Sequence, residues 1–137
     1  MSAGGRASQR KGAEAERELA RLLRGYGYEV ERGGSLSYGT VPDLTGLPGL
    51  HIEAKRCERL ALPAWVEQAE ADAARFRDGV PVVVFRQSRE PWRVCLRLSD
   101  FMEIYKKTAP PLRAVNEPLP RFCGGCVKSH EKEAEET

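Results

Sequence analysis

Apolar residues at helical spacing define the first element of the chain. They lie mostly three or four positions apart on one face of an amphipathic helix, and they are Ala15, Leu19, Leu22, Leu23 and Tyr26. The pattern predicts a helix that starts near Lys11 and ends at Gly25 and Gly27. Residues 1–9 are rich in Gly, Ser and Ala and have no apolar periodicity, so we expect a flexible N-terminus.

Three strand-like runs follow this helix. Residues 28–32 alternate between apolar and polar side chains, and the Gly- and Ser-containing residues 33–40 are typical of a loop or a bent connection. Residues 41–47 and 50–56 form two further strand-like runs joined at Pro48 and Gly49. Since a proline followed by glycine favours a tight turn, these two strands should be antiparallel neighbours.

The second half of the chain predicts a helix, two strands and a final helix. Pro63 is suited to the first turn of a helix with an apolar stripe of Trp65, Val66, Ala69, Ala73 and Phe76, and Gly79 is expected to end it. Residues 80–87 are typical of a buried central strand, residues 92–98 of a half-covered one, and Ser88 to Pro91 of the turn between them. Asp100 and Glu103 predict a capping box on a short helix that ends near Lys107.

The complete order is one helix, three strands, one helix, two strands and one helix. It predicts an α/β fold whose central mixed β-sheet is flanked by helices. We expect the folded domain to span residues 10–107. Several prolines interrupt residues 108–137, which predicts an extended C-terminal tail.

Composition narrows the class of protein without deciding the function. A chain of 137 residues fits one domain, and no window approaches the roughly 18 apolar residues of a membrane span. The first residues lack the apolar stretch of a secretory signal, so we expect a cytoplasmic protein. Cys57 and Cys95 lie in strand-like runs and are expected to be reduced core thiols.

The net charge of +2 conceals an asymmetry between the body of the chain and its end. The last nine residues carry four glutamates and one lysine, so the remainder carries about +5. This is a modest electrostatic footprint for a polyanionic partner, and by itself it is more typical of an ordinary solvated surface.

The main candidates for catalytic residues are Asp43, Glu53 and Lys55. Glu53 and Lys55 are two positions apart in a strand and should share a face, while Ile52 and Ala54 pack into the core behind them. If the Pro48–Gly49 turn pairs the strands, Asp43 reaches the same face. Two carboxylates and an ammonium would then converge.

This trio has the chemistry needed to hydrolyse a phosphodiester. Carboxylate oxygens bind hard divalent cations, and a neighbouring lysine can position water and stabilise developing negative charge. Surface charges paired across a hairpin are the ordinary alternative for such a pattern. The position of the trio at the end of an otherwise buried strand favours the functional interpretation.

The sequence around the trio resembles a known family. The segments RKGAEAERELARLLRGYGYEVERGGS, PDL and IEAK resemble Holliday junction resolvases of the archaeal type, which belong to the PD-(D/E)xK nuclease superfamily, over roughly residues 10–98. The segments GLPGLHIEAKRCERL and EQAEADA resemble resolvase-like nucleases of bacteriophages and prophages even more closely. The loop from Ser35 to Val41 is longer than in the archaeal pattern, and residues 108–137 have no counterpart there.

The resemblance implies a restriction-endonuclease-like fold and assigns further site residues. Glu16, Asp43 and Glu53 would bind Mg²⁺, with Mn²⁺ expected to substitute, although Glu16 taken alone is more typical of a solvated helix face. Lys55 and Gln68 would complete the catalytic set, although a helix-surface glutamine without a role is equally expected. The residues expected to contact DNA, mainly through phosphates, are Arg10, Lys11, Arg17, Ser35, Arg56 and Arg59.

These assignments together predict a metal-dependent endodeoxyribonuclease. The resemblance implies a structure-selective Holliday junction resolvase of phage or prophage origin, acting on branched DNA as a homodimer in the cytoplasm of a bacterial host cell. The alternative is a DNA-binding module of the same fold that does not cleave, or the nuclease component of a larger DNA-processing complex. Intact Glu16, Asp43, Glu53 and Lys55 favour an active enzyme.

The tail contains a separate motif, Cys123-Gly-Gly-Cys126, followed by His130. A structural zinc site needs four ligands, and the tail offers three, so zinc would require ligands shared within a dimer. An incidental pair of thiols is the favoured interpretation, ahead of zinc and of redox chemistry.

Overall fold

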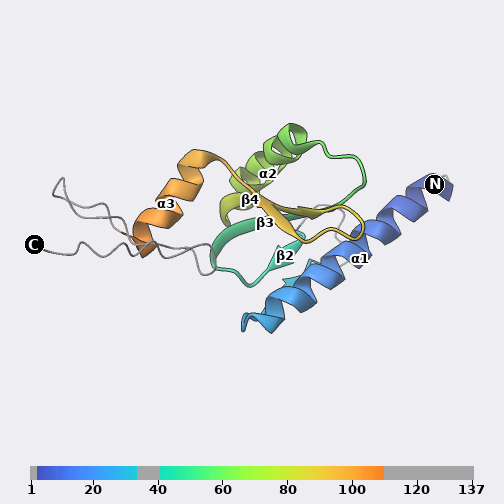
Figure 1. Cartoon of the computed structure of the whole chain (residues 1–137), viewed down its shortest axis with the longest axis horizontal. Coiled ribbons are helices and arrows are strands. Elements are labelled where there is room, and N and C mark those ends of the chain that lie inside the picture. Colours follow the sequence, from blue (N-terminus) through green and yellow to red (C-terminus); the bar gives the residue numbers. More distant parts are fainter. Residues whose placement is uncertain (1–2, 34–40, 110–137) are drawn as a thin grey trace, which may run out of the picture.

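The fold is built on one mixed β-sheet with a helix on each face (Figure 1). The computed structural model describes residues 3–33 and 41–109. Along the chain the elements are α1 (Ala3–Gly25), β1 (Glu31–Arg32), β2 (Leu44–Thr45), β3 (Gly49–Arg56), α2 (Leu62–Phe76), β4 (Gly79–Arg86), β5 (Arg93–Cys95) and α3 (Leu98–Thr108). This order is the predicted one.

The sheet has the spatial order β1-β2-β3-β4-β5. β1, β2 and β3 are antiparallel neighbours, whereas β4 lies parallel to β3 along eight residue pairs and β5 is antiparallel to β4. The parallel pair requires a crossover, and α2 provides it. The sheet is therefore mixed, as predicted.

The turn between β2 and β3 has the predicted chemistry. The Leu50 N–H donates to the Leu47 carbonyl at 3.1 Å, and Gly49 has a φ of 86°. Proline and then a residue of positive φ at the two central positions make a type II turn. The antiparallel hairpin predicted at Pro48 and Gly49 is confirmed, and it sets Leu44 opposite Ile52.

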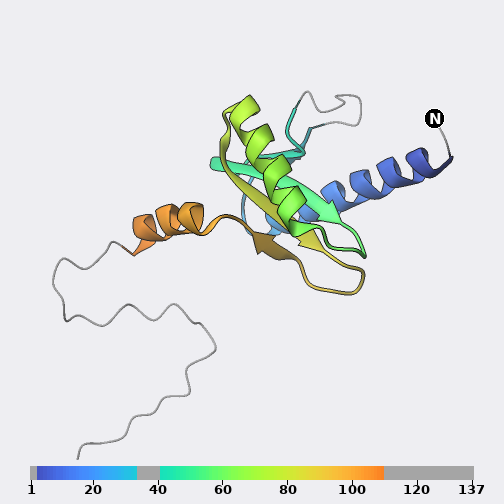
Figure 2. The same ribbon diagram turned by 90° about the horizontal axis from the view of Figure 1, so that it is seen from above.

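The two faces of the sheet carry separate apolar clusters. α1 contributes Leu19 and Ala20 to a cluster that includes Leu44, Ile52 and Val82. On the other face, α2 contributes Trp65 and Ala69, which pack with Val83 and Phe85. In Figure 2, α2 crosses the front of the sheet and α1 runs behind it. Both views place α3 beyond the sheet, and α3 has no buried residue.

Several predicted boundaries are wrong because they relied on apolar periodicity. α1 begins at Ala3 and not near Lys11, so residues 3–9 are helical where a flexible segment was expected. Residues 4–9 are exposed and need no apolar stripe. β1 and β5 are shorter than residues 28–32 and 92–98 because only residues 31–32 and 93–95 find partners in the sheet.

The predicted roles of Gly79 and Asp100 are also wrong. α2 ends at Phe76, and Arg77 adopts a left-handed φ of 51° while its N–H donates to the Ala73 carbonyl at 2.8 Å. Gly79 instead begins β4. Asp100 lies in the first turn of α3 and accepts a hydrogen bond from Nε of Arg97, the N-cap residue, at 2.7 Å.

The prediction that Cys57 is a core thiol is wrong, because Cys57 lies just beyond β3 and is exposed. Cys95 is half-buried, at the end of the edge strand β5. Neither of these described cysteines forms a disulfide. Among the described residues, no helix has the length and apolar character needed to cross a membrane.

Candidate active site

β3 carries the first two residues of the candidate site. Ile52 is 2% exposed and packs toward α1, whereas Glu53 is 5% exposed and lines a cavity on the α2 side. Lys55 follows on the same face, and its Nζ lies 2.8 Å from Glu53 Oε1. The predicted alternation along this strand is therefore observed, although Ala54 is half-buried and not fully enclosed.

Asp43 reaches β3 through the hairpin. It lies immediately before β2, and its Oδ2 accepts a hydrogen bond from the Ala54 N–H at 3.1 Å. Its carbonyl accepts the Gly33 N–H at 3.0 Å, which fixes the backbone at this point. Asp43 and Glu53 line the same cavity, whose volume is about 270 Å³.

The two carboxylates are held in an environment that disfavours their charge. Burial raises the pKa of Asp43 above its ordinary value, and the hydrogen bond from Ala54 and the charge of Lys55 oppose this rise only in part. Burial also raises the pKa of Glu53, and the negative charge of Asp43 raises it further. A divalent cation would relieve both effects, and carboxylate oxygens are its preferred donors. The donor set therefore fits a hard metal ion.

Gln68 lies where α2 passes over the end of β3. Its Oε1 accepts a hydrogen bond from Lys55 Nζ at 3.1 Å, and Gln68 also lines the cavity. The structure thus brings together four of the five predicted catalytic residues, Asp43, Glu53, Lys55 and Gln68.

Glu16 is near this group but has a different partner. From α1, its Oε2 accepts hydrogen bonds from Nε and Nη2 of Arg32, each at 3.0 Å. Burial raises the pKa of Glu16, and electrostatic repulsion by the Asp43 carboxylate raises it further. Glu16 does not line the cavity that Asp43 and Glu53 share.

The predicted phosphate contacts are spread around the site. Arg10, Lys11 and Arg17 are exposed on α1, and Arg59 is exposed beyond the end of β3. Arg56 is half-buried, and its Nη1 lies 3.6 Å from Glu18 Oε2. The remaining sequence candidates, Ser35, Cys123, Cys126 and His130, lie outside the described residues.

Two potential metal ligands of the cavity were missed by sequence reasoning. His51 is 1% exposed on β3 and Asp72 is half-buried on α2, and both line the cavity with Glu53. The signal for His51 was its position, because a residue two before Glu53 in a strand must share the face of Glu53. Asp72 carried a weaker signal, four residues after Gln68 on one helix face.

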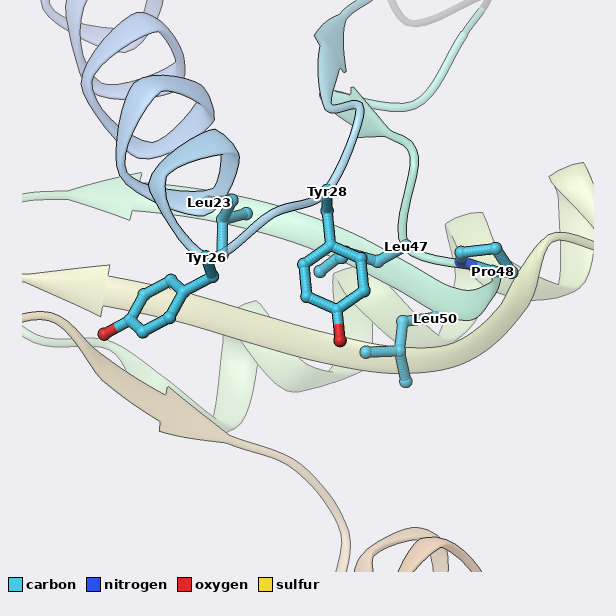
Figure 3. A pocket seen from close by; sticks show the side chains of 6 residues that line it. All are labelled: Leu23, Tyr26, Tyr28, Leu47, Pro48 and Leu50. Atoms are coloured by element: carbon cyan, nitrogen blue, oxygen red, sulfur yellow. The ribbon is translucent and has the colours of Figure 1, made fainter.

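A second pocket has a different character. It has a volume of about 420 Å³ and lies between the end of α1 and the β2–β3 turn, where Figure 3 shows the rings of Tyr26 and Tyr28 beside Leu23, Leu47, Pro48 and Leu50. These six residues include no carboxylate and no cation. The pocket therefore offers neither metal ligands nor charged phosphate donors.

Asp43, immediately before β2, meets the Glu53-x-Lys55 sequence of the adjacent antiparallel strand β3 in a mixed α/β sheet. This arrangement is the one expected of PD-(D/E)xK nucleases. The family described as "Phage putative PDDEXK endonuclease" matches residues 7–116, and the chain belongs to this family. The predicted superfamily and its restriction-endonuclease-like fold class are thereby confirmed.

The solved structures that resemble the chain include a Holliday junction resolvase from the archaeal hyperthermophile Archaeoglobus fulgidus. The two sequences are 27% identical, and the match covers 61% of this chain and 70% of that one with a TM-score of 0.46. No curated protein matches the chain.

Proposed function

We propose that this protein is a divalent-metal-dependent endonuclease that hydrolyses phosphodiester bonds of DNA. The observation that carries the proposal is the convergence of Asp43 and Glu53 at one cavity, with Lys55 Nζ 2.8 Å from Glu53 Oε1. Membership of a phage endonuclease family supports it.

Each residue of the site has a role that follows from its chemistry. Asp43 and Glu53 would hold Mg²⁺ or Mn²⁺ through their carboxylate oxygens, and Glu16 would join them if it left Arg32. When bound, the cation would activate water and neutralise charge on the phosphate.

Lys55 is the positively charged hydrogen-bond donor of the site. Its ammonium lies between Glu53 Oε1 and Gln68 Oε1, at 2.8 and 3.1 Å, so its position is fixed before DNA binds. An ammonium held in this way can donate to a phosphate oxygen as negative charge develops there. Gln68 orients Lys55 and can also donate its amide N–H to a water or a phosphate.

The DNA structure that the enzyme prefers is a finer part of the proposal. The sequence resemblance to resolvases favours a four-way junction as the substrate. A junction presents two equivalent strands, so we further propose that the protein cuts it as a two-fold homodimer. Membership of a phage endonuclease family supports the further proposal that this reaction takes place in the cytoplasm of a bacterial host cell.

Incubation of the purified chain with labelled four-way junction, flap, duplex and single-stranded DNA tests the proposal. Each substrate is combined with Mg²⁺, Mn²⁺, Ca²⁺ or chelator, and both binding and strand scission are measured. We expect scission with Mg²⁺ and Mn²⁺, and fastest with the junction. Scission that is undiminished in chelator would refute the metal-dependent mechanism. Binding without scission under every condition would favour the non-cleaving DNA-binding module.

A further inference from the structure

His51 occupies an unusual position for a histidine. It is 1% exposed, and its Nδ1 lies 3.0 and 2.9 Å from the two carboxylate oxygens of Asp78. Its Nε2 is buried and has no hydrogen-bond partner among the residues that the structure describes. Because a buried polar atom without a partner is costly, this nitrogen requires an explanation.

The side chains around His51 explain why its Nε2 has no hydrogen-bond partner. A ring nitrogen of His51 and carboxylate oxygens of Glu53 and Asp72 all lie within 4.8 Å of one another. Since Nδ1 already contacts the Asp78 carboxylate, Nε2 is the ring nitrogen that can bind a metal ion. The three residues line the same cavity and come from two elements, β3 and α2.

One nitrogen and two carboxylates form a typical ligand set for a divalent transition metal. Metal-binding histidines commonly present one nitrogen to the ion and donate the other N–H to a carboxylate, which fixes the tautomer and the ring. Asp78 is placed to accept this N–H. We propose that His51, Glu53 and Asp72 bind a divalent transition metal ion such as Mn²⁺, with Asp78 as the positioning residue of His51.

This ion would lie beside the position proposed for the catalytic cation between Asp43 and Glu53. Glu53 belongs to both sets, whereas His51 and Asp72 belong only to the second. Since imidazole nitrogen suits transition metals better than it suits Mg²⁺, the set should favour Mn²⁺ over Mg²⁺. Metal binding in the absence of DNA does not rest on the proposed cleavage reaction, so the two proposals can fail separately.

A purely structural role for His51 makes a different prediction. The ring stacks on Phe76 with centroids 6.1 Å apart, and with Asp78 it links β3 to the segment that follows α2. If packing alone keeps His51 in place, added Mn²⁺ will not contact its nitrogen.

Spectroscopy of Mn²⁺ bound to the full chain tests the proposal directly. Electron spin-echo envelope modulation detects the nitrogen nucleus of an imidazole bound to Mn²⁺, and the chain contains only two histidines, His51 and His130. We expect nitrogen modulation in the wild-type protein and in His130→Asn, and its loss in His51→Asn. Titration calorimetry should show Mn²⁺ binding at least about tenfold weaker in His51→Asn, which retains an N–H donor for Asp78.

Asp72→Asn keeps the proposal falsifiable if His51→Asn does not fold, as judged by circular dichroism. This variant should also weaken Mn²⁺ binding by about tenfold, while the nearby Glu70→Gln on α2 should bind Mn²⁺ as the wild type does. Absence of nitrogen modulation in the wild type would overturn the proposal, as would its persistence in His51→Asn. Unchanged Mn²⁺ affinity in Asp72→Asn would exclude Asp72 as a ligand.

Discussion

At the scale of single residues, the main conflict lies between the burial of Asp43 and Glu53 and their charge. Both carboxylates have a raised pKa, with burial as the largest cause, although Lys55 lies beside Glu53. The cost of desolvation therefore exceeds the gain from the ion pair, as is common for buried charges. In the absence of a cation, the site should reduce the stability of the folded chain.

The stability of Glu53→Gln in chelator tests this balance. Because the pKa of Glu53 is higher in the folded than in the unfolded state, protonation favours folding, and this contribution is lost as the pH rises through the raised pKa. We expect Glu53→Gln to melt at a higher temperature than the wild type at pH 7. A gain of about 1 kcal/mol would raise the melting temperature by about 4 °C or more.

The difference between Glu53→Gln and the wild type should shrink as the pH falls toward 4.5, the ordinary pKa of a glutamate. Melting followed by circular dichroism from pH 4 to 8 checks this trend. A lower melting temperature for Glu53→Gln at pH 7 would show that the ion pair with Lys55 outweighs desolvation.

Asp43→Asn should abolish strand scission while it preserves the fold. The amide keeps an oxygen that can accept the Ala54 N–H but removes the charge that a cation needs, so scission should fall on the order of 100-fold or more. Single-turnover assays at saturating Mg²⁺ measure this loss. Glu58→Gln is a matched control, since Glu58 is exposed and binds Ser88 outside the cavity. A normal rate in Asp43→Asn would remove Asp43 from the site.

At the scale of elements, the parallel pairing of β3 with β4 fixes the candidate site. Pairing begins where Gly49 lies opposite Gly79, and a Cβ on Gly79 would come within 2.3 Å of the Gly49 carbonyl. Gly79 also has a φ of 137°, which side chains rarely adopt. This glycine contact holds the start of β3, and therefore His51 and Glu53, in register with β4.

Gly79→Ala should destabilise the protein by about 1–3 kcal/mol, because of both the backbone conformation and the close approach to Gly49. Urea unfolding measures this change. Gly12→Ala is the control: Gly12 lies within α1 with open space around it, so alanine should stabilise the helix by about 0.5–1 kcal/mol. Equal effects of the two substitutions on the free energy of unfolding would show that the Gly49–Gly79 contact does not limit the stability of the protein.

At the scale of the whole molecule, basic residues of α1 lie to one side of the sheet. The N-terminal turns of α1 extend beyond the sheet in both views, and they carry exposed Arg6, Arg10 and Lys11 (Figures 1 and 2). α3 lies at the other end of the described chain with exposed Lys106 and Lys107. This arrangement offers two basic regions that can be tested separately for contact with DNA.

Salt dependence distinguishes the two basic regions. If Arg10 and Lys11 each neutralise one phosphate of duplex DNA, their double alanine variant should reduce the slope of log K against log salt concentration by about 0.9 per contact. Fluorescence anisotropy in Ca²⁺ between low and moderate salt measures the slope. The charge-matched control, Lys106→Ala with Lys107→Ala, should leave it unchanged. If both double variants reduced the slope equally, the DNA would be attracted by the overall positive charge and not by specific contacts with α1.

The features that depend on local periodicity and turn chemistry could be predicted from the amino-acid sequence alone. These are the order of the elements, the hairpin at Pro48 and Gly49, and the shared face of Glu53 and Lys55. Each follows from backbone geometry within a few residues, because strand side chains alternate and proline followed by glycine favours a turn.

Contacts between residues that are distant in the sequence became evident from the fold. His51 contacts Asp78, 27 positions away, and Asp72 approaches Glu53 because α2 packs across β3. The end of α2 at Phe76 and the close contact of Gly79 with Gly49 also depend on how β4 returns beside β3. Such contacts arise from the packing of whole elements, and the periodicity of one segment contains no information about the side chains of another.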